Sequence, residues 1–244
     1  METTVPTLLF KFIDKENLSD FINDGNLFFK NTGYFIDLEE KYGDTIFGDK
    51  YEGTHFLHFD PKRHSLFIEY EGKRIPIEFE SGYSTKKYES VKDFQLTCFV
   101  APDLEDFISE DNKTFFFKNS VIEELKREFK DRAVIIIHNP EGFIGALKES
   151  AQKINLGFKY GKVNYFDPRS ETPLDYKEFE KDIAKAFFNK RKTYQYQREF
   201  RIVTQQPIKK DYIKIHIRNI KDYVTLINDI DALKTDFSMI IDTL

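Results

Sequence analysis

The sequence has no tryptophan, a single cysteine and no long apolar run. One cysteine excludes an intramolecular disulfide, which is typical of proteins in a reducing cytoplasm. No stretch approaches the ~20 apolar residues that a membrane-spanning helix needs. The N-terminal segment also lacks the basic region and apolar core of a signal peptide. We therefore predict a soluble, cytoplasmic protein without a membrane partner.

Glycine and proline are scarce as well, with 11 and 8 residues among 244, which excludes a fibrous or low-complexity chain. What is abundant is phenylalanine: 26 Phe and 13 Tyr bring the aromatic share to 16%. This much apolar surface can offset the entropy of ordering the chain, so we predict a folded protein. Because no linker rich in Gly and Ser interrupts the sequence, we predict a single domain over residues 1–244.

Strand patterns outnumber helical patterns along the chain. Alternating or continuous apolar runs predict strands at 7–13, 54–59, 65–70, 74–80, 94–100, 114–117, 133–137, 156–166, 199–204 and 212–217. The strands at 54–59 and 65–70 flank the turn at 60–63 and predict a hairpin. Helical spacing predicts helices at 15–24, 120–129, 175–187 and 220–233, with capping boxes at Ser120/Glu123 and Asp175/Glu178. Strands and helices do not alternate regularly, which favours an α+β fold with a mainly antiparallel sheet and flanking helices.

Several familiar sites are missing. The sequence contains no GxGxxG, Walker A, HExxH or GxSxG motif. His55 and His58 differ by three positions on a predicted strand and so point to opposite faces, and no acid or cysteine completes a set of metal ligands. We therefore predict no metal site. Cys98 stands between apolar residues, which predicts buried packing rather than a nucleophile.

Charge is segregated along the chain, although the formal net charge is only −5. Residues 14–60 hold eleven acids and four lysines, a net of −7, whereas residues 185–218 hold ten Lys and Arg and two acids, a net of +8. Two interpretations remain open. The two segments lie side by side and neutralise each other, or the late segment forms a basic surface that binds phosphates. Tyr194, Tyr196 and Tyr212 lie among the basic residues, where they could stack on bases or belong to the core.

The strongest local pattern is KRKTYQYQREFRIV at residues 190–203. Strand alternation predicts Gln197, Glu199 and Arg201 on one face, spaced ~7 Å apart. A carboxylate held between an amide and a guanidinium can orient a ribose hydroxyl and stabilise positive charge at an anomeric carbon. The alternative is a solvated strand face with an ordinary Glu199–Arg201 ion pair.

The spacing Gln197-x-Glu199 at the start of a late strand resembles the Gln/Glu-x-Glu motif of ADP-ribosyltransferases. The wider sequence resembles a poorly characterised bacterial family that is similar to that fold, over roughly residues 8–204. The shared phrases are LFKF (9–12), GNLFFK (25–30), GDKYEG (48–53), LTCF (96–99), VNYF (163–166) and YQREFRI (196–202). The resemblance implies a split, ADP-ribosyltransferase-like sheet and NAD as the substrate.

The resemblance also implies roles for single residues. Glu199 is expected to be the catalytic carboxylate, with Gln197 orienting the substrate or the acceptor. The expected NAD-binding residues are Lys11, Tyr34, Thr97 and Arg201. Among them, Tyr34 would stack on nicotinamide and Thr97 would support Glu199. The sequence departs from the transferase pattern at Lys11, where Arg or His is usual, and in the central strand, which has no Ser-Thr-Ser triplet.

Three hypotheses of function follow. The first is an NAD-dependent ADP-ribosyltransferase or NAD glycohydrolase, acting as a toxin or phage-defence effector on a nucleic acid or protein, with an antitoxin or defence-system partner. The second is a non-catalytic module that senses nucleic acid (RNA or DNA) or a phage protein through the basic segment 185–218, using Lys190, Arg191 and Lys192. The third, a metal-dependent nuclease, has less support because no cluster of acids falls at a suitable spacing.

Overall fold

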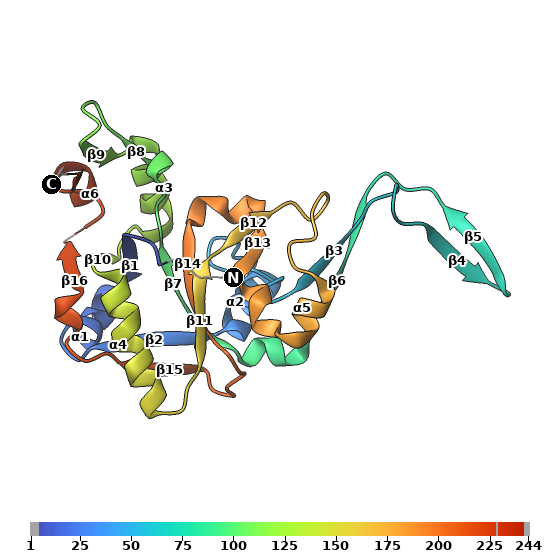
Figure 1. Ribbon diagram of the computed structural model, residues 1–244, viewed down its shortest axis with the longest axis horizontal. Helices are drawn as coiled ribbons and strands as arrows, with labels where there is room; N and C mark the ends of the chain where they lie inside the picture. The colour runs from blue at the N-terminus through green and yellow to red at the C-terminus, as the bar shows by residue number, and fades with distance from the viewer. Residues whose placement is uncertain (1–4, 228, 242–244) are drawn as a thin grey trace.

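A computed structural model describes residues 5–227 and 229–241 of the chain. The architecture is mixed α+β, with mostly antiparallel sheets and flanking helices, which confirms the coarse prediction (Figure 1). Among the described residues, the largest sheet has eight strands. Six of them follow the order β11 (Phe158–Lys162), β14 (Glu199–Thr204), β7 (Gln95–Val100), β1 (Leu9–Ile13), β10 (Ala133–Ile137) and β16 (Val224–Ile227). The other two are β2 (Asn26–Asn31), which also pairs with β7, and β15 (Tyr212–His216), which pairs with β2.

The large sheet divides along β7. Strand β2 pairs with the beginning of β7, at Gln95 and Leu96, whereas β1 pairs with its end, at Val100. Between these pairings, residues 97–99 have β14 as their only hydrogen-bonded neighbour strand in the described part of the chain. Two groups of strands therefore diverge from one side of β7, and the space between them holds the candidate site.

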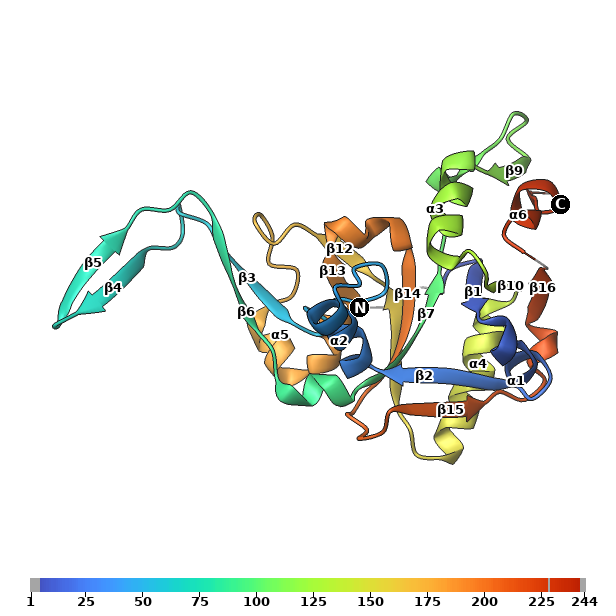
Figure 2. The same cartoon turned by 180° about the vertical axis from the view of Figure 1, so that it is seen from behind.

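Three apolar clusters hold the elements together. One face of the sheet packs on α1 (Leu18–Ile22) and α4 (Pro140–Lys153), as Figure 2 shows from behind. The opposite face, at β1 and β10, packs on α3 (Asn119–Phe129) and α6 (Ala232–Thr235). The third cluster joins β7 and β14 to α2 (Thr32–Tyr42) and to the 3-10 helices Glu89–Asp93 and Ile183–Phe188.

The remaining elements are small. Strands β8 (Phe107–Ile108), β9 (Thr114–Phe117) and β17 (Met239–Ile240) pair beside α3. Strands β12 (Asn164–Phe166) and β13 (Asn189–Arg191) form a parallel pair, and α5 (Tyr176–Lys181) lies between them in the sequence. The helix α5 begins where Asp175 predicts it, because the Asp175 carboxylate accepts hydrogen bonds from the backbone of Lys177 and Glu178.

A two-stranded ribbon, here called the β-arm (residues 55–86), extends far from the sheet (Figures 1 and 2). Its base pairs β3 (His55–Phe59) with β6 (Gly82–Lys86), and its tip pairs β4 (Leu66–Tyr70) with β5 (Lys73–Ile77). The predicted hairpin of 54–59 with 65–70 is therefore wrong. The chain turns back at Glu71-Gly72, where both residues have positive φ, as a tight two-residue hairpin turn requires.

Other sequence predictions also differ from the structure. The sequence patterns do not predict helices α2 and α4, and the helix expected at 220–233 is wrong. In that segment the structure has a 3-10 turn Ile220–Asp222, then β16 and α6, while residue 228 lies outside the described residues. Val224, Thr225 and Ile227 are β-branched, and they pair with β10 instead of continuing a helix. Helix α3 begins after Lys118 without a side-chain cap, so the expected Ser120/Glu123 capping box is not formed.

Candidate functional site

A cavity of about 470 Å³ opens where β1 and β2 diverge from β7. Strands β1, β2, β7 and β14 contribute to its wall, together with the start of α2, the loop after α2 and the end of α3. All six residues expected at a catalytic or NAD-binding site line it: Lys11, Tyr34, Thr97, Gln197, Glu199 and Arg201. Residues far apart in the sequence thus meet in one place.

Glu199 is a nearly buried carboxylate held between two cations. Its Oε1 accepts a hydrogen bond from Lys190 Nζ at 3.0 Å, and its Oε2 accepts one from Arg201 Nε at 2.5 Å. Burial by itself raises the pKa of Glu199, but the charges of Arg201 and Lys190 outweigh it and lower the pKa to about 2. The carboxylate is therefore ionised at neutral pH.

Arg201 is one of the most buried side chains of the protein, at 1% exposure. Its Nη1 and Nη2 donate to the two oxygens of Glu52 at 2.6 and 3.1 Å, and Nη1 also donates to the carbonyl of Phe187 at 2.6 Å. The four groups Glu52, Glu199, Lys190 and Arg201 here form the charged cluster. Their formal charges sum to zero, which is the condition under which ionised side chains can be buried together.

The loop GDKYEG at 48–53 places Glu52 in this cluster. It ends at Gly53, whose φ is +66°, and a Cβ there would lie 2.6 Å from Val91 Cγ1 and 2.7 Å from the ring of Phe187. Only glycine fits this close approach without displacing its neighbours. The loop therefore turns tightly against the third apolar cluster and directs Glu52 toward Arg201.

Gln197 lies in the cavity wall, but not on the strand where alternation predicts it. The strand begins at Glu199, because Arg198 adopts a left-handed conformation (φ 48°) at the end of the 3-10 helix Lys192–Gln197. The Gln197 amide accepts from Lys190 Nζ and donates to the carbonyl of Ile46, both at 2.6 Å. Gln197 therefore links Lys190 to the loop that follows α2.

Lys11 and Thr97 meet in the part of β7 that lacks a neighbour strand on one side. Lys11 Nζ donates to Thr97 Oγ1 and to the carbonyl of Cys98, both at 2.7 Å. The ammonium thus satisfies a carbonyl that a strand would satisfy elsewhere in the sheet. Burial lowers the pKa of Lys11 to about 8. In the described structure Thr97 bonds Lys11 and not Glu199, so the expected support of Glu199 by Thr97 is not seen.

Aromatic rings and cations lie close together in the cavity wall. Tyr34 is 46% exposed, and Lys30 Nζ lies 4.8 Å from the centre of its ring. Across the cavity wall, the Arg132 guanidinium lies 4.9 Å from the ring of Phe47. Exposed aromatic rings suit stacking on a base or a nicotinamide, and Lys and Arg suit phosphate oxygens.

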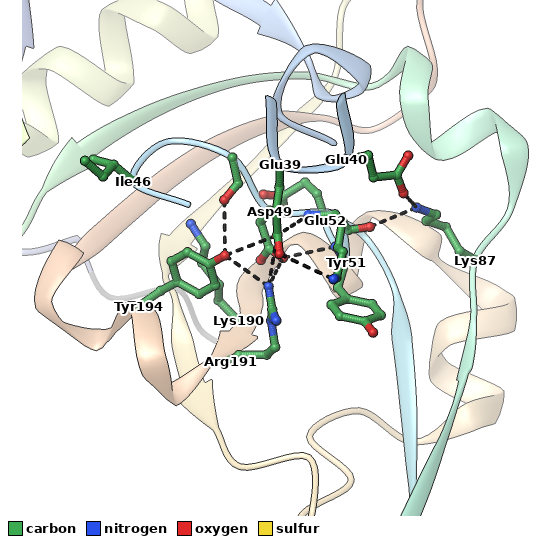
Figure 3. A network of polar contacts seen from close by, with 12 residues as sticks. Glu39, Glu40, Ile46, Asp49, Tyr51, Glu52, Lys87, Lys190, Arg191 and Tyr194 are labelled. Atoms are coloured by element: carbon green, nitrogen blue, oxygen red, sulfur yellow. Dashed lines mark hydrogen bonds and ion pairs between the residues drawn. The ribbon is translucent and has the colours of Figure 1, made fainter. Parts of the chain in front are cut away.

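The three residues expected to bind nucleic acid do not form a common surface. Lys190 is 3% exposed and belongs to the charged cluster. Arg191 donates to Glu39 at 3.1 Å and to Asp49 at 3.0 Å, beside the ring of Tyr194 (Figure 3). Only Lys192 of the three is exposed.

These ion pairs join the acidic segment 14–60 to the basic segment 185–218. Glu39 and Asp49 pair with Arg191, Glu52 pairs with Arg201, and Asp20 pairs with Lys214 at 2.8 Å. Of the two interpretations of the charge segregation, mutual neutralisation therefore describes much of the late basic segment.

Cys98 also lines the cavity, and its thiol is mainly protonated at neutral pH. Burial raises the pKa of its thiol to about 12, so the thiolate that would attack is scarce. Within the described residues no three His, Cys, Asp or Glu side chains come together as metal ligands. The same part of the chain contains no helix with the length and apolar character of a membrane span.

The sequence patterns assigned no role to several residues of the cavity wall, among them Glu52, Arg132 and Glu128. The position of Glu128 could have been predicted from the sequence. Val121, Ile122 and Leu125 form the buried face of α3, and Glu128 continues the same helical spacing where an apolar residue is expected. An acid at such a position indicates a buried carboxyl group.

Comparison of the chain with protein-family models, with curated proteins and with solved structures gave no match. The function of this chain is therefore inferred from the geometry and electrostatics of the cavity together with the sequence resemblance.

Proposed function

We propose that this protein is an ADP-ribosyltransferase-like enzyme that uses NAD as its substrate, with Glu199 as the catalytic carboxylate. One observation carries the proposal: Glu199, ionised and nearly buried, lies in a single cavity with the other five residues that the resemblance links to NAD. The division of the large sheet along β7 supports a split, ADP-ribosyltransferase-like fold.

The size and the lining of the cavity support NAD as the substrate. Its volume of about 470 Å³ falls within the ~300–1,000 Å³ of small-molecule sites. Tyr34 would stack on the nicotinamide ring, and Lys30 and Arg132 would contact the pyrophosphate. Lys11, with its ammonium at the open edge of β7, would contact the nicotinamide ribose or a phosphate. NAD supplies the activated bond between nicotinamide and ribose.

Glu199 can serve this reaction without moving a proton. A carboxylate has about four lone-pair positions, and Lys190 and Arg201 each take one. The remaining positions can accept a hydrogen bond from a ribose hydroxyl. As nicotinamide departs, positive charge develops at the anomeric carbon, and a fixed negative carboxylate stabilises it more than it stabilises the ground state. Lys190 and Arg201 are then positioning residues that hold Glu199 in place. Arg201 was expected to bind NAD directly, but its donors are directed to Glu199, Glu52 and the Phe187 carbonyl, so it acts through Glu199.

The direct test measures release of nicotinamide and transfer of labelled ADP-ribose to protein and to nucleic acid in a cell lysate, scored separately. We expect Glu199→Gln to lower both rates by on the order of 10²–10³. Glu149→Gln, on the exposed side of α4, is the matched control and should leave both rates unchanged. Circular dichroism verifies that each variant is folded. A wild-type rate no higher than that of folded Glu199→Gln would rule out the proposal.

A second pair of variants tests nicotinamide stacking. Tyr34 lies at the start of α2 in the cavity, and Tyr42 lies at the end of the same helix, 77% exposed. Tyr34→Ala should raise the KM for NAD about tenfold, because one stacked ring contributes ~1–3 kcal/mol. Tyr42→Ala should leave KM unchanged. Equal KM values for the two variants would show that Tyr34 does not bind NAD.

A further inference from the structure

Glu128 is another carboxyl group of the cavity, on the wall formed by the end of α3. Its side chain is 3% exposed. Its Oε1 is buried and has no hydrogen-bond partner among the described residues, and the nearest cation, Arg127 Nη2, lies 3.9 Å away. A buried carboxyl without hydrogen bonds is costly to keep, and burying the ionised form costs most. Such a group is typical of a site that binds or reacts.

Charged and titratable groups face Glu128 from several elements. Arg127 and Glu124 lie on its own helix, and Glu199 begins β14. Arg198 comes from the end of the preceding 3-10 helix, and Tyr196 lies within that helix. Burial raises the pKa of Glu128 to about 8 although the two arginines oppose it, and the charges of Glu124 and Glu199 add to the increase. Near neutral pH, Glu128 can therefore both hold and release a proton.

Glu199 and Glu128, both in the cavity wall, differ in environment. Glu199 contacts two cations and stays ionised, whereas Glu128 contacts no hydrogen-bond donor at Oε1 and exchanges a proton near the working pH. Pairs of acids whose surroundings separate their pKa values in this way commonly divide the work of catalysis. A general base acts best when its pKa lies close to the operating pH.

We propose that Glu128 is a second catalytic residue, the general base that accepts the proton of the attacking hydroxyl of the acceptor, or of water. The inference rests on the proposed transfer from NAD. In the reaction the bond between the anomeric carbon and the nicotinamide nitrogen breaks, and its electron pair stays with nicotinamide. A new bond forms between the acceptor oxygen and the anomeric carbon, and the hydroxyl proton moves to the Glu128 carboxylate. Only the ionised form of Glu128 can accept that proton.

The test compares the pH dependence of nicotinamide release in the wild type and Glu128→Gln. The wild-type rate should rise with pH and level off above an apparent pKa of about 8. Glu128→Gln should lose this rise and 10²–10⁴-fold in kcat, while its Kd for NAD stays the same. Glu123→Gln, on the exposed side of α3, should keep the wild-type profile. Glu128→Asp, which retains a carboxylate, should recover part of the rate.

A nucleophile that carries no proton can show whether Glu128 acts as a base or only supports the structure. Azide needs no base, so sodium azide should restore nicotinamide release in Glu128→Gln but not in Glu199→Gln. If the wild type is active and Glu128→Gln keeps its rate and pH profile, the role of Glu128 is wrong and the transferase proposal stands. The role of Glu128 is equally wrong if azide fails to rescue folded Glu128→Gln. If the folded wild type releases no nicotinamide, both proposals are wrong.

Discussion

The cavity and the β-arm both depart from the usual distribution, in which charged side chains are exposed and apolar side chains are buried. In the cavity, Arg201 is 1% exposed and lies among other buried charges. On the tip of the β-arm, Ile68 and Tyr70 are 52% and 63% exposed. Charged side chains are thus inside and apolar side chains outside, within one chain.

The difference shows what each region requires from its neighbours. Each member of the charged cluster has a partner from another element, so loss of one member leaves an uncompensated charge in the interior. The tip of the β-arm consists of one ladder, in which Ile68 faces Ile75 and Leu66 faces Ile77. Substitutions there change one pair of side chains and little else. We therefore expect the loss of stability on substitution to depend on how many partners a side chain has, and not on whether it is polar or apolar.

The largest expected effect is the loss of Arg201. Arg201→Met should destabilise the fold by about 3–5 kcal/mol, because it leaves Glu52 and Glu199 without their main partner. Urea unfolding at pH 7 measures this value. The double variant Glu52→Gln/Arg201→Met should recover part of the loss, because it removes one of the two abandoned acids. Independent, additive effects of the two substitutions would show that the cluster does not act as a unit.

Glu128 should make the fold less stable in alkali. Its pKa is about 8 in the folded protein and near 4.5 in the unfolded chain, so its contribution is fully present below pH 4.5 and is lost as pH rises toward 8 and above. Between pH 5 and pH 9 this amounts to on the order of 4 kcal/mol. Unfolding of Glu128→Gln across that range should show a smaller loss than the wild type. Parallel curves would mean that Glu128 titrates normally.

Glu199 should have the opposite pH dependence. Its pKa falls from 4.5 in the unfolded chain to about 2 in the folded protein, so its contribution is present above pH 4.5 and is lost as pH falls toward 2. The loss is on the order of 3 kcal/mol. Glu199→Gln should be less stable than the wild type at pH 7 and approach it near pH 2. A constant difference between the two proteins would contradict the lowered pKa.

The smallest effect is expected on the β-arm. Ile68→Ala should change the free energy of unfolding by less than about 0.5 kcal/mol, as exposed positions usually do. The same substitution at Ile135, fully buried in β10, should cost about 2–5 kcal/mol through the cavity it creates. Urea unfolding of both variants gives the comparison. A large loss at Ile68 would show that the tip contributes to the stability of the folded body.

The fold was predictable from sequence where local pattern and burial agree. The patterns of β14, β7 and β10 correctly predicted strands, because their side chains pack into the core. On the β-arm the same kind of pattern belongs to exposed strands. Residues 65–80 resemble core strands in sequence, and no local signal shows that β4 and β5 are exposed. The pairing of the strands depends on the turn at Glu71-Gly72. The alternation of apolar residues within the strands does not predict that turn.

The candidate site was predictable in part. The residues that meet in the cavity were grouped by resemblance, but their contacts depend on the fold. Lys190 looked like a surface cation, because its pairing with Glu199 needs β13 and β14 to come together. Gln197 was expected on a strand, because Arg198 gives no sign of its left-handed conformation. Glu128 could have been found from the helical spacing of α3, because it occupies a position where an apolar residue is expected.

The pairing of β3 with β6 at the base of the β-arm affects how this chain can vary in length. Phe59 and Gly82 are direct partners across β3 and β6, so the segment between them begins and ends at neighbouring points in space. No cavity-lining residue falls within that segment. Residues 60–81 are therefore an insertion in the geometric sense: a short turn could close the gap, and the walls of the cavity would keep their places.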